Sequence, residues 1–161
     1  MDMTLFLGQA GWVLMLGLAA IGSSLGIGAA GRAAAGAWAK EAKAGKPLSF
    51  TYIVLTGMPL SQTLYAFLLL FLLQEKVVGT ESAVVSQYAG VIFGIGLGCG
   101  LLELFSAWLQ GMIGAAACRA LSEGEGKGFV NMIIAMGIVE SVGLLGMIFL
   151  LLSVLKIQVP A

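Results

Sequence analysis

The sequence contains no histidine and few charges. Only 10% of its 161 residues are charged, whereas 60% are hydrophobic; a soluble domain usually has about 25% charged and about 45–50% apolar residues. Without histidine, the chain lacks the commonest metal ligand and pH-responsive base. A formal net charge of zero provides no long-range field to attract nucleic acid. So much apolar surface exceeds what a core of this size can bury, and we expect lipid to cover it.

Cysteine is scarce, and a nucleotide-binding loop is missing. Cys99 and Cys118 lie 19 positions apart in one apolar segment, which is about 28 Å along a helix axis and far beyond the reach of a disulfide. We interpret both as small packing residues. No G-x-x-x-x-G-K-[ST] motif occurs, so we do not expect the chain to hydrolyse a nucleotide or to be an enzyme.

The few charges divide the chain into four long apolar segments. Each uncharged or nearly uncharged run has at least 28 residues, and about 20 suffice to cross the hydrocarbon core. Backbone polar groups at that depth must bond internally, and at these lengths this requires α-helix. We therefore predict an all-α membrane protein with four transmembrane helices over residues 10–38, 50–74, 87–120 and 128–155.

The connections between these segments indicate an orientation. Six of the eight Lys and Arg residues lie around the first and third connections: Arg32, Lys40, Lys43, Lys46, Arg119 and Lys127. By the positive-inside rule, those two connections are cytoplasmic and both termini lie outside. We therefore expect a multi-pass protein of the cell (inner or plasma) membrane.

The chain also repeats itself. Aligning Ser24 with Ser106 gives an offset of 82, and aligning Gln62 with Glu140 gives an offset of 78. The sequence thus predicts two tandem hairpins in the same orientation, residues 1–80 and 81–161. The first and third segments are rich in glycine at four-residue spacing, which lets helices approach closely in lipid. We expect these two inside and the bulkier second and fourth segments outside.

Glu140 is the main candidate for function. It lies near the middle of the fourth segment, in MGIVESVGLL, with no Lys or Arg expected at the same depth. A bare carboxylate there is costly, so Glu140 is either protonated or holds a bound cation. Either state makes it a reversible ion carrier. A protonated carboxyl that serves only as an interhelical hydrogen bond is the structural alternative.

Polar residues at similar depth surround this position. Gln62 and Gln110 lie 12 and nine residues from the cytoplasmic ends of their segments, and Glu140 lies 11, so the three depths agree within about 5 Å. Pro59 cannot continue the helical hydrogen bonding, which frees the carbonyl of Leu55 and lets nearby carbonyls tilt toward a ligand. One face of the second segment carries Met58, Ser61, Gln62 and Tyr65.

This donor set favours sodium over a proton. A proton needs only the carboxylate, whereas a hard cation needs several oxygen ligands. The carboxylate of Glu140, the amide oxygens of Gln62 and Gln110, the Ser61 hydroxyl and the Met58 carbonyl are available, and one carboxylate matches one monovalent ion. Tyr65 is positioned to donate a hydrogen bond to Glu140. Hydrogen bonding between helices without an ion is the alternative for the polar partners.

A second carboxyl, Glu103, lies in the third segment. It is seven residues from Gln110, and thus roughly 10 Å further toward the outside. Three interpretations stay open: a protonated packing group, which we favour, a second relay group, or a water-exposed residue lining the inner side of an assembly.

Taken in order, these residues resemble a known family. Two hairpins, glycine-rich odd-numbered helices, and the motifs PLSQTLY, FSAWLQG and VESVGLLG resemble the proteolipid (K or c) subunit of V-type and A/V-type rotary ATPases. Its sodium-carrying branch has residues that correspond here to Pro59, Ser61, Gln62, Tyr65, Gln110 and Glu140, with the carbonyl before the proline on Met58. Serine stands where that branch has threonine, and Glu103 has no counterpart.

The resemblance implies a ring of identical protomers that rotates past a stator subunit, driven by shaft subunits on the cytoplasmic loops. Glu140 would carry Na⁺, or alternatively H⁺, across the membrane, coupled to ATP hydrolysis or synthesis. One carboxylate per two hairpins lowers the number of ions per turn, which favours a pump over a synthase. A small secondary transporter or a channel-forming oligomer is the alternative function; a purely structural oligomer would not need the mid-membrane glutamate.

Overall fold

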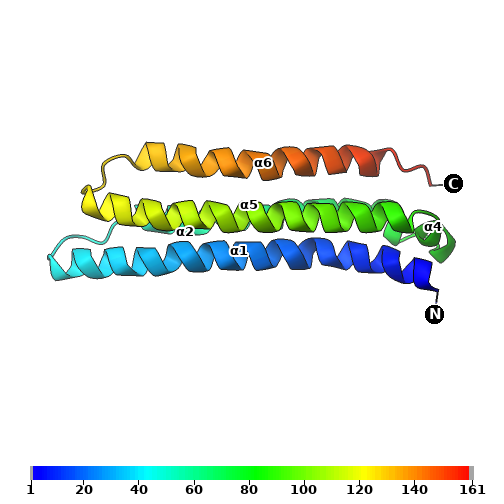
Figure 1. Ribbon diagram of the computed structural model, residues 1–161, viewed down its shortest axis with the longest axis horizontal. Helices are drawn as coiled ribbons and strands as arrows, with labels where there is room; N and C mark the ends of the chain where they lie inside the picture. Colours follow the sequence, from blue (N-terminus) through cyan, green and yellow to red (C-terminus); the bar gives the residue numbers. More distant parts are fainter. Residues whose placement is uncertain (1, 160–161) are drawn as a thin grey trace.

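Residues 2–159 are described by a computed structural model, and their regular structure is entirely helical. Four rods lie alongside one another (Figure 1), and each is long and apolar enough to cross a membrane. This confirms the predicted all-α class with four membrane spans. In chain order the elements are α1 (Met3–Lys43), α2 (Thr51–Gly57), η1 (Met58–Leu60), α3 (Ser61–Leu73), η2 (Gln74–Val78), α4 (Ser82–Gln87), α5 (Ala89–Glu123) and α6 (Phe129–Leu155).

Helix α1 extends beyond its predicted span at both ends, the second and third rods continue four and three residues past theirs, and α6 matches its prediction within one residue. Helix α1 begins at Met3 because the Asp2 side chain caps it, accepting a hydrogen bond from the Thr4 amide at 2.9 Å. Such a cap satisfies one of the backbone amides that a helix N-terminus leaves unpaired. Hydropathy alone could not locate this start, because it depends on the hydrogen bond that Asp2 accepts.

The second connection is shorter and more helical than the sequence indicated. The second rod continues through η2, a π-helical turn in which the Gly79 amide donates to the Gln74 carbonyl at 2.8 Å. The short helix α4 follows after only three residues. A side chain at Gly79 would come within 2.9 Å of the Gln74 carbonyl oxygen, so the absence of a side chain permits the tight turn.

The two glycine-rich helices, α1 and α5, make the most extensive helix–helix contact of the described chain. They run side by side in the same direction (Figure 1). A Cβ atom added at Gly26 would meet the backbone of Ala107, and one added at Gly111 would meet the backbone of Gly26. The expected close packing of these segments is therefore present, with backbone against backbone.

The other two rods lie against this pair. The second rod contacts both α1 and α5, whereas α6 contacts α5 and α3. Two apolar clusters stabilise the arrangement: one around Met15, Leu69 and Val154, and the other around Tyr52 and Met136. The polar cluster described below lies at the level between them.

The first and third connections meet at one end of the bundle (Figure 1). Lys46 forms an ion pair with Glu125 at 2.9 Å, which links them directly. Within the same end, the Tyr52 hydroxyl donates to the Glu41 carboxylate at 2.9 Å. The start of α1 and the end of α6 both lie at the opposite end of the bundle (Figure 1). The two connections that hold most of the Lys and Arg residues therefore lie at the same end of the bundle, as the positive-inside rule requires.

Candidate functional site

Pro59 shapes the first part of the site. The proline lies in η1, where the α-helical pattern of α2 gives way to a single 3₁₀ turn before α3, because proline has no amide hydrogen to donate. The Met58 carbonyl accepts hydrogen bonds from both the amide and the hydroxyl of Ser61, the latter at 3.0 Å. The same hydroxyl lies 3.1 Å from Gln62 Oε1. Three oxygens thus gather on one turn of the second rod.

The carbonyl that Pro59 frees lies against α5. A Cβ atom added at Gly114 would come within 3.0 Å of the Leu55 carbonyl oxygen, so this glycine makes room for the distorted turn. The sequence predicted that Pro59 disturbs the helical hydrogen bonding, and the structure has a 3₁₀ turn at this place, with α5 packed directly against it.

A chain of amides connects this turn to α6. Gln62 and Gln110 are completely buried, and Gln62 Nε2 donates to Gln110 Oε1 at 3.0 Å. Gln110 Nε2 in turn donates to Glu140 Oε2 at 3.1 Å and to the Met136 carbonyl at 3.2 Å. Three helices are therefore joined through one buried glutamine, and the Glu140 carboxylate is the acceptor at the end of the chain.

Tyr65 holds the other oxygen of the carboxylate. Its hydroxyl donates to Glu140 Oε1 at 2.9 Å, so each Glu140 oxygen has one donor. Both side chains are half-buried at the outer side of the cluster. Both donors are neutral, so neither supplies a positive charge to balance a carboxylate.

The Glu140 carboxylate has no basic partner among residues 2–159. Within these residues, the ion pair that forms joins Lys46 to Glu125, and it lies on the connections at the end of the bundle. A carboxylate in the apolar interior without a counter-ion is costly, so Glu140 requires a proton or a cation as its partner. The nearby oxygens of Gln62, Ser61 and Met58 are of the type that hard cations prefer.

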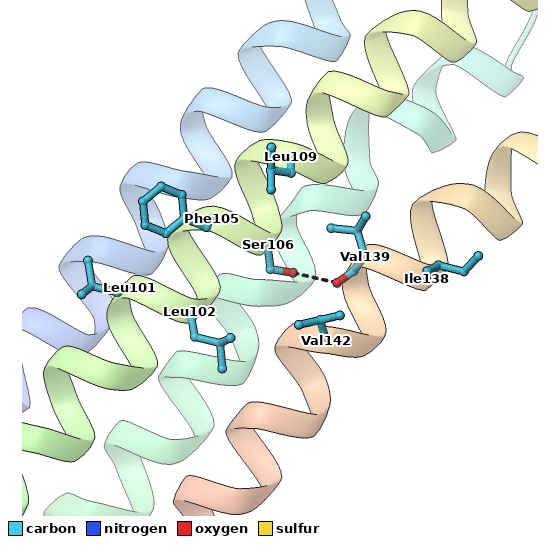
Figure 2. Close-up of a pocket in the computed structure, with 8 residues that line it drawn as sticks. All are labelled: Leu101, Leu102, Phe105, Ser106, Leu109, Ile138, Val139 and Val142. Carbon is cyan, nitrogen blue, oxygen red and sulfur yellow. Dashed lines mark hydrogen bonds between the residues drawn. The ribbon is translucent and has the colours of Figure 1, made fainter.

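Ser106 is a further member of the cluster, which the sequence had not indicated. Its Oγ accepts a hydrogen bond from Gln62 Nε2 at 3.2 Å and donates to the Val139 carbonyl at 3.2 Å. Figure 2 shows the second of these bonds at the base of an apolar pocket of about 420 Å³ between α5 and α6. Ser106 precedes Gln110 by four residues, and this spacing on one helical face was the signal that could have identified it.

Glu103 is also part of this interior. It is completely buried on α5, and neither carboxyl oxygen has a hydrogen-bond partner. Of the three interpretations open from the sequence, exposure to water is therefore wrong for the described chain. A Cβ atom added at Gly143 of α6 would lie 2.7 Å from Glu103 Oε2 and 2.8 Å from Ser106 Oγ.

The residues that the sequence marked as ion ligands lie in one hydrogen-bonded cluster. Their contacts run through four elements of the structure, and Glu140 is the acidic member. Their role in holding an ion stays a prediction. The members are Met58, Ser61, Gln62, Tyr65, Gln110 and Glu140.

Comparison with known proteins identifies the family. The sequence model for the c subunit of ATP synthase matches the chain twice, over residues 10–73 and 93–153, which together make up most of its length. No curated protein sequence matches the chain. Members of this family are non-catalytic rotor subunits that form homo-oligomeric rings beside a stator subunit and bind a coupling ion, H⁺ or Na⁺, at a carboxylate. The chain therefore belongs to the ATP synthase c-subunit family, as a multi-pass membrane subunit of a rotor ring.

Proposed function

We propose that this chain is the sodium-carrying rotor subunit of a V-type (A/V-type) rotary ATPase, with Glu140 as the ion-carrying residue. The observation that supports the proposal is the environment of its carboxylate. Donors from Tyr65 and Gln110 hold both oxygens in place, and a group of neutral oxygens lies next to the chain of amides. A proton alone would not need this second set of oxygens.

Sodium would lie between the Glu140 carboxylate and the neutral oxygens on the turn at Pro59. Its ligands would be the Glu140 carboxylate, the amide oxygen of Gln62, the Ser61 hydroxyl and the Met58 carbonyl. Gln110 presents its amide nitrogen to Glu140. For its amide oxygen to become a further ligand of the sodium ion, the amide group would rotate by 180°. The carboxylate and a monovalent ion neutralise each other, which allows the loaded protomer to face lipid.

The transport cycle follows because the Glu140 carboxylate must be neutralised wherever it faces lipid. When a protomer reaches the stator, a positive side chain there replaces the ion at Glu140, and the ion leaves through an aqueous half-channel. Continued rotation brings the empty carboxylate to the second half-channel, where another ion binds. The side chains of this chain hold and release the ion, whereas ATP is hydrolysed elsewhere in the complex.

The two hairpins, residues 1–80 and 81–161, would have different tasks in this scheme. The first hairpin provides Ser61 and Gln62 as neutral ligands, and the second provides the charge at Glu140. One carboxylate per two hairpins means fewer ions per turn, so each ion can be moved against a steeper gradient; this supports a pump. We place the Lys46 and Glu125 connections in the cytoplasm, where shaft subunits would dock, and both termini outside.

Carbodiimide labelling tests the proposal, since the reagent modifies protonated carboxyls in apolar surroundings. In the purified ring, labelling at Glu140 should fall as Na⁺ rises, and Glu140→Gln should abolish both labelling and ion transport while rings still assemble. Retained transport in Glu140→Gln would disprove the assignment of the carrier. Labelling of Glu140 that Na⁺ does not prevent at neutral pH would show that the ion is a proton.

A secondary transporter or a channel-forming oligomer is the other candidate function. Either would conduct ions without a stator or ATP. Isolated rings reconstituted in lipid vesicles should therefore be tight to Na⁺ under our proposal, and a steady Na⁺ leak through rings without a stator would support the alternative.

A further inference from the structure

The most unusual group outside the proposed ion ligands is the Glu103 carboxyl. It is completely buried, both its oxygens lack a partner, and the proposed transport cycle does not use it. A carboxylate in this state has lost its hydration and gained nothing in return, which is strongly unfavourable. The group must therefore either bind a cation or remain neutral.

The surroundings of Glu103 do not suit a metal cation. No Lys or Arg of residues 2–159 forms an ion pair with Glu103, and its charge interacts with those of Glu140 on α6, Tyr65 on α3 and Cys99 on α5, none of which can be positive. Cys99, one turn before Glu103, belongs to the apolar cluster around Met15 and Leu69. A Cβ atom at Gly143 would lie within 3 Å of both Glu103 Oε2 and Ser106 Oγ, but no polar group of the described residues makes a hydrogen bond to Glu103, whereas a hard cation needs several oxygen ligands. A proton, by contrast, needs none.

The geometry points to a task for that proton. Glu103 and Ser106 are three residues apart on one face of α5, and both point toward Gly143. Ser106 Oγ donates to the Val139 carbonyl and accepts from Gln62, so one of its two lone pairs is still free. A carboxylic acid O–H has one hydrogen to donate, and after a rotation of the Glu103 side chain the Ser106 hydroxyl, on the same face of α5, would accept it.

We propose that Glu103 is a permanently protonated positioning residue that fixes the ion site through Ser106. The Glu103 hydroxyl donates to Ser106, and Ser106 orients the amide of Gln62 so that Gln62 Oε1 faces Ser61 and the ion. Glu103 itself never exchanges an ion. This inference rests on the proposed binding of Na⁺ by Gln62 and Glu140.

A neutral Glu103 also sets the charge of the site. With Glu103 protonated, the cluster has one negative charge, at Glu140, and one monovalent ion balances it. With both carboxyls ionised, the cluster would carry two negative charges and a divalent ion would be the better match. Glu103 would thus act as a specificity residue although it does not touch the ion.

Two substitutions at Glu103 separate positioning from ion exchange. Glu103→Gln keeps a neutral donor of the same shape, so Na⁺ protection of Glu140 against carbodiimide should stay within about threefold of the wild-type ring. Glu103→Leu removes the donor, and the half-protecting Na⁺ concentration should rise about fivefold, as expected for a lost hydrogen bond of about 1 kcal/mol. Loss of Na⁺ protection in Glu103→Gln, or unchanged protection in Glu103→Leu, would overturn the proposal.

Gly143 offers an independent test that leaves both carboxyls in place. Gly143→Ala would push a methyl group against Glu103 Oε2 and Ser106 Oγ, at 2.7 and 2.8 Å, and should weaken Na⁺ binding about as much as Glu103→Leu. Gly137→Ala on the same helix is the matched control, since a Cβ there would have nothing within 4 Å. Equal effects of the two alanines, or none at Gly143, would contradict the proposed contact.

Infrared spectroscopy and ion counting detect the proton itself. The Na⁺-loaded ring should show the C=O stretch of a protonated carboxyl, which Glu103→Gln removes, and should bind one Na⁺ per protomer. A missing band, or a second Na⁺ that disappears in Glu103→Gln, would overturn the proposal. A ring that keeps the band but shows no Na⁺ protection would refute the sodium assignment and would still support a neutral Glu103.

Discussion

Replacing Tyr65 by phenylalanine removes one hydrogen bond to the carboxylate of Glu140, the proposed ion carrier, and preserves the shape of the aromatic side chain. The Tyr65 hydroxyl donates to Glu140 Oε1 at 2.9 Å. A hydrogen bond to a charged group contributes about 1.5–3 kcal/mol, and the half-buried position of both side chains places this one at the lower end. A loss of about 1.5 kcal/mol corresponds to roughly a tenfold weaker affinity. We therefore expect Tyr65→Phe to raise the half-protecting Na⁺ concentration about tenfold.

The assay is Na⁺ protection of Glu140 against carbodiimide in the purified ring, with the labelled fraction measured by mass spectrometry. Tyr52→Phe is the matched control, because it removes an equally long bond from a tyrosine hydroxyl to a glutamate, Glu41, on the same rod but away from the site. It should leave the protection curve unchanged. An unchanged curve for Tyr65→Phe, or equal shifts for both variants, would refute the view that this hydroxyl positions the carboxylate.

Three other predictions follow from contacts at and away from the site. Gln110→Leu removes the buried link from α3 to α6, and leaving its partners unpaired costs about 1–3 kcal/mol; the protection assay should show at least about a fivefold loss of Na⁺ affinity. Gly22→Ala places a methyl group against the Leu104 backbone and should reduce the fraction of rings that survive detergent electrophoresis, whereas Gly17→Ala, with nothing within 4 Å, should not. The hydrogen bond from Lys46, together with its charge, lowers the pKa of Glu125, so the link between the two connections is fully present at neutral pH and is lost as the pH falls below the ordinary glutamate value of about 4.3. Amide hydrogen exchange of residues 124–127, corrected for its intrinsic pH dependence, should then increase, and no increase would argue against the link.

Hydropathy predicted the four spans well because lipid imposes a length and a composition on every crossing helix. It could not predict where α1 begins, because that depends on one cap at Asp2, nor η2, because that depends on one tight turn at Gly79. In both places a local backbone contact, rather than apolar content, determines the structure.

Most residues of the candidate site could be predicted from the sequence, because lipid also restricts which side chains occur at this depth. Polar side chains are rare at this depth, so depth and helical face alone select Gln62, Gln110 and Glu140. Ser106 escaped notice because serine is common in membrane helices and gives no charge signal. The sequence also could not determine whether Glu103 is buried, because its burial depends on the small size of Gly143 on another helix.

The bare seam between α1 and α5 has a mechanical consequence. With the backbones of Gly11 and Gly96, and of Gly26 and Gly111, in direct contact, neither helix can slide or roll against the other without a collision. The two hairpins, each of which contributes one of these helices, are therefore joined rigidly, and the chain turns in the ring as a single unit rather than as two independent hairpins.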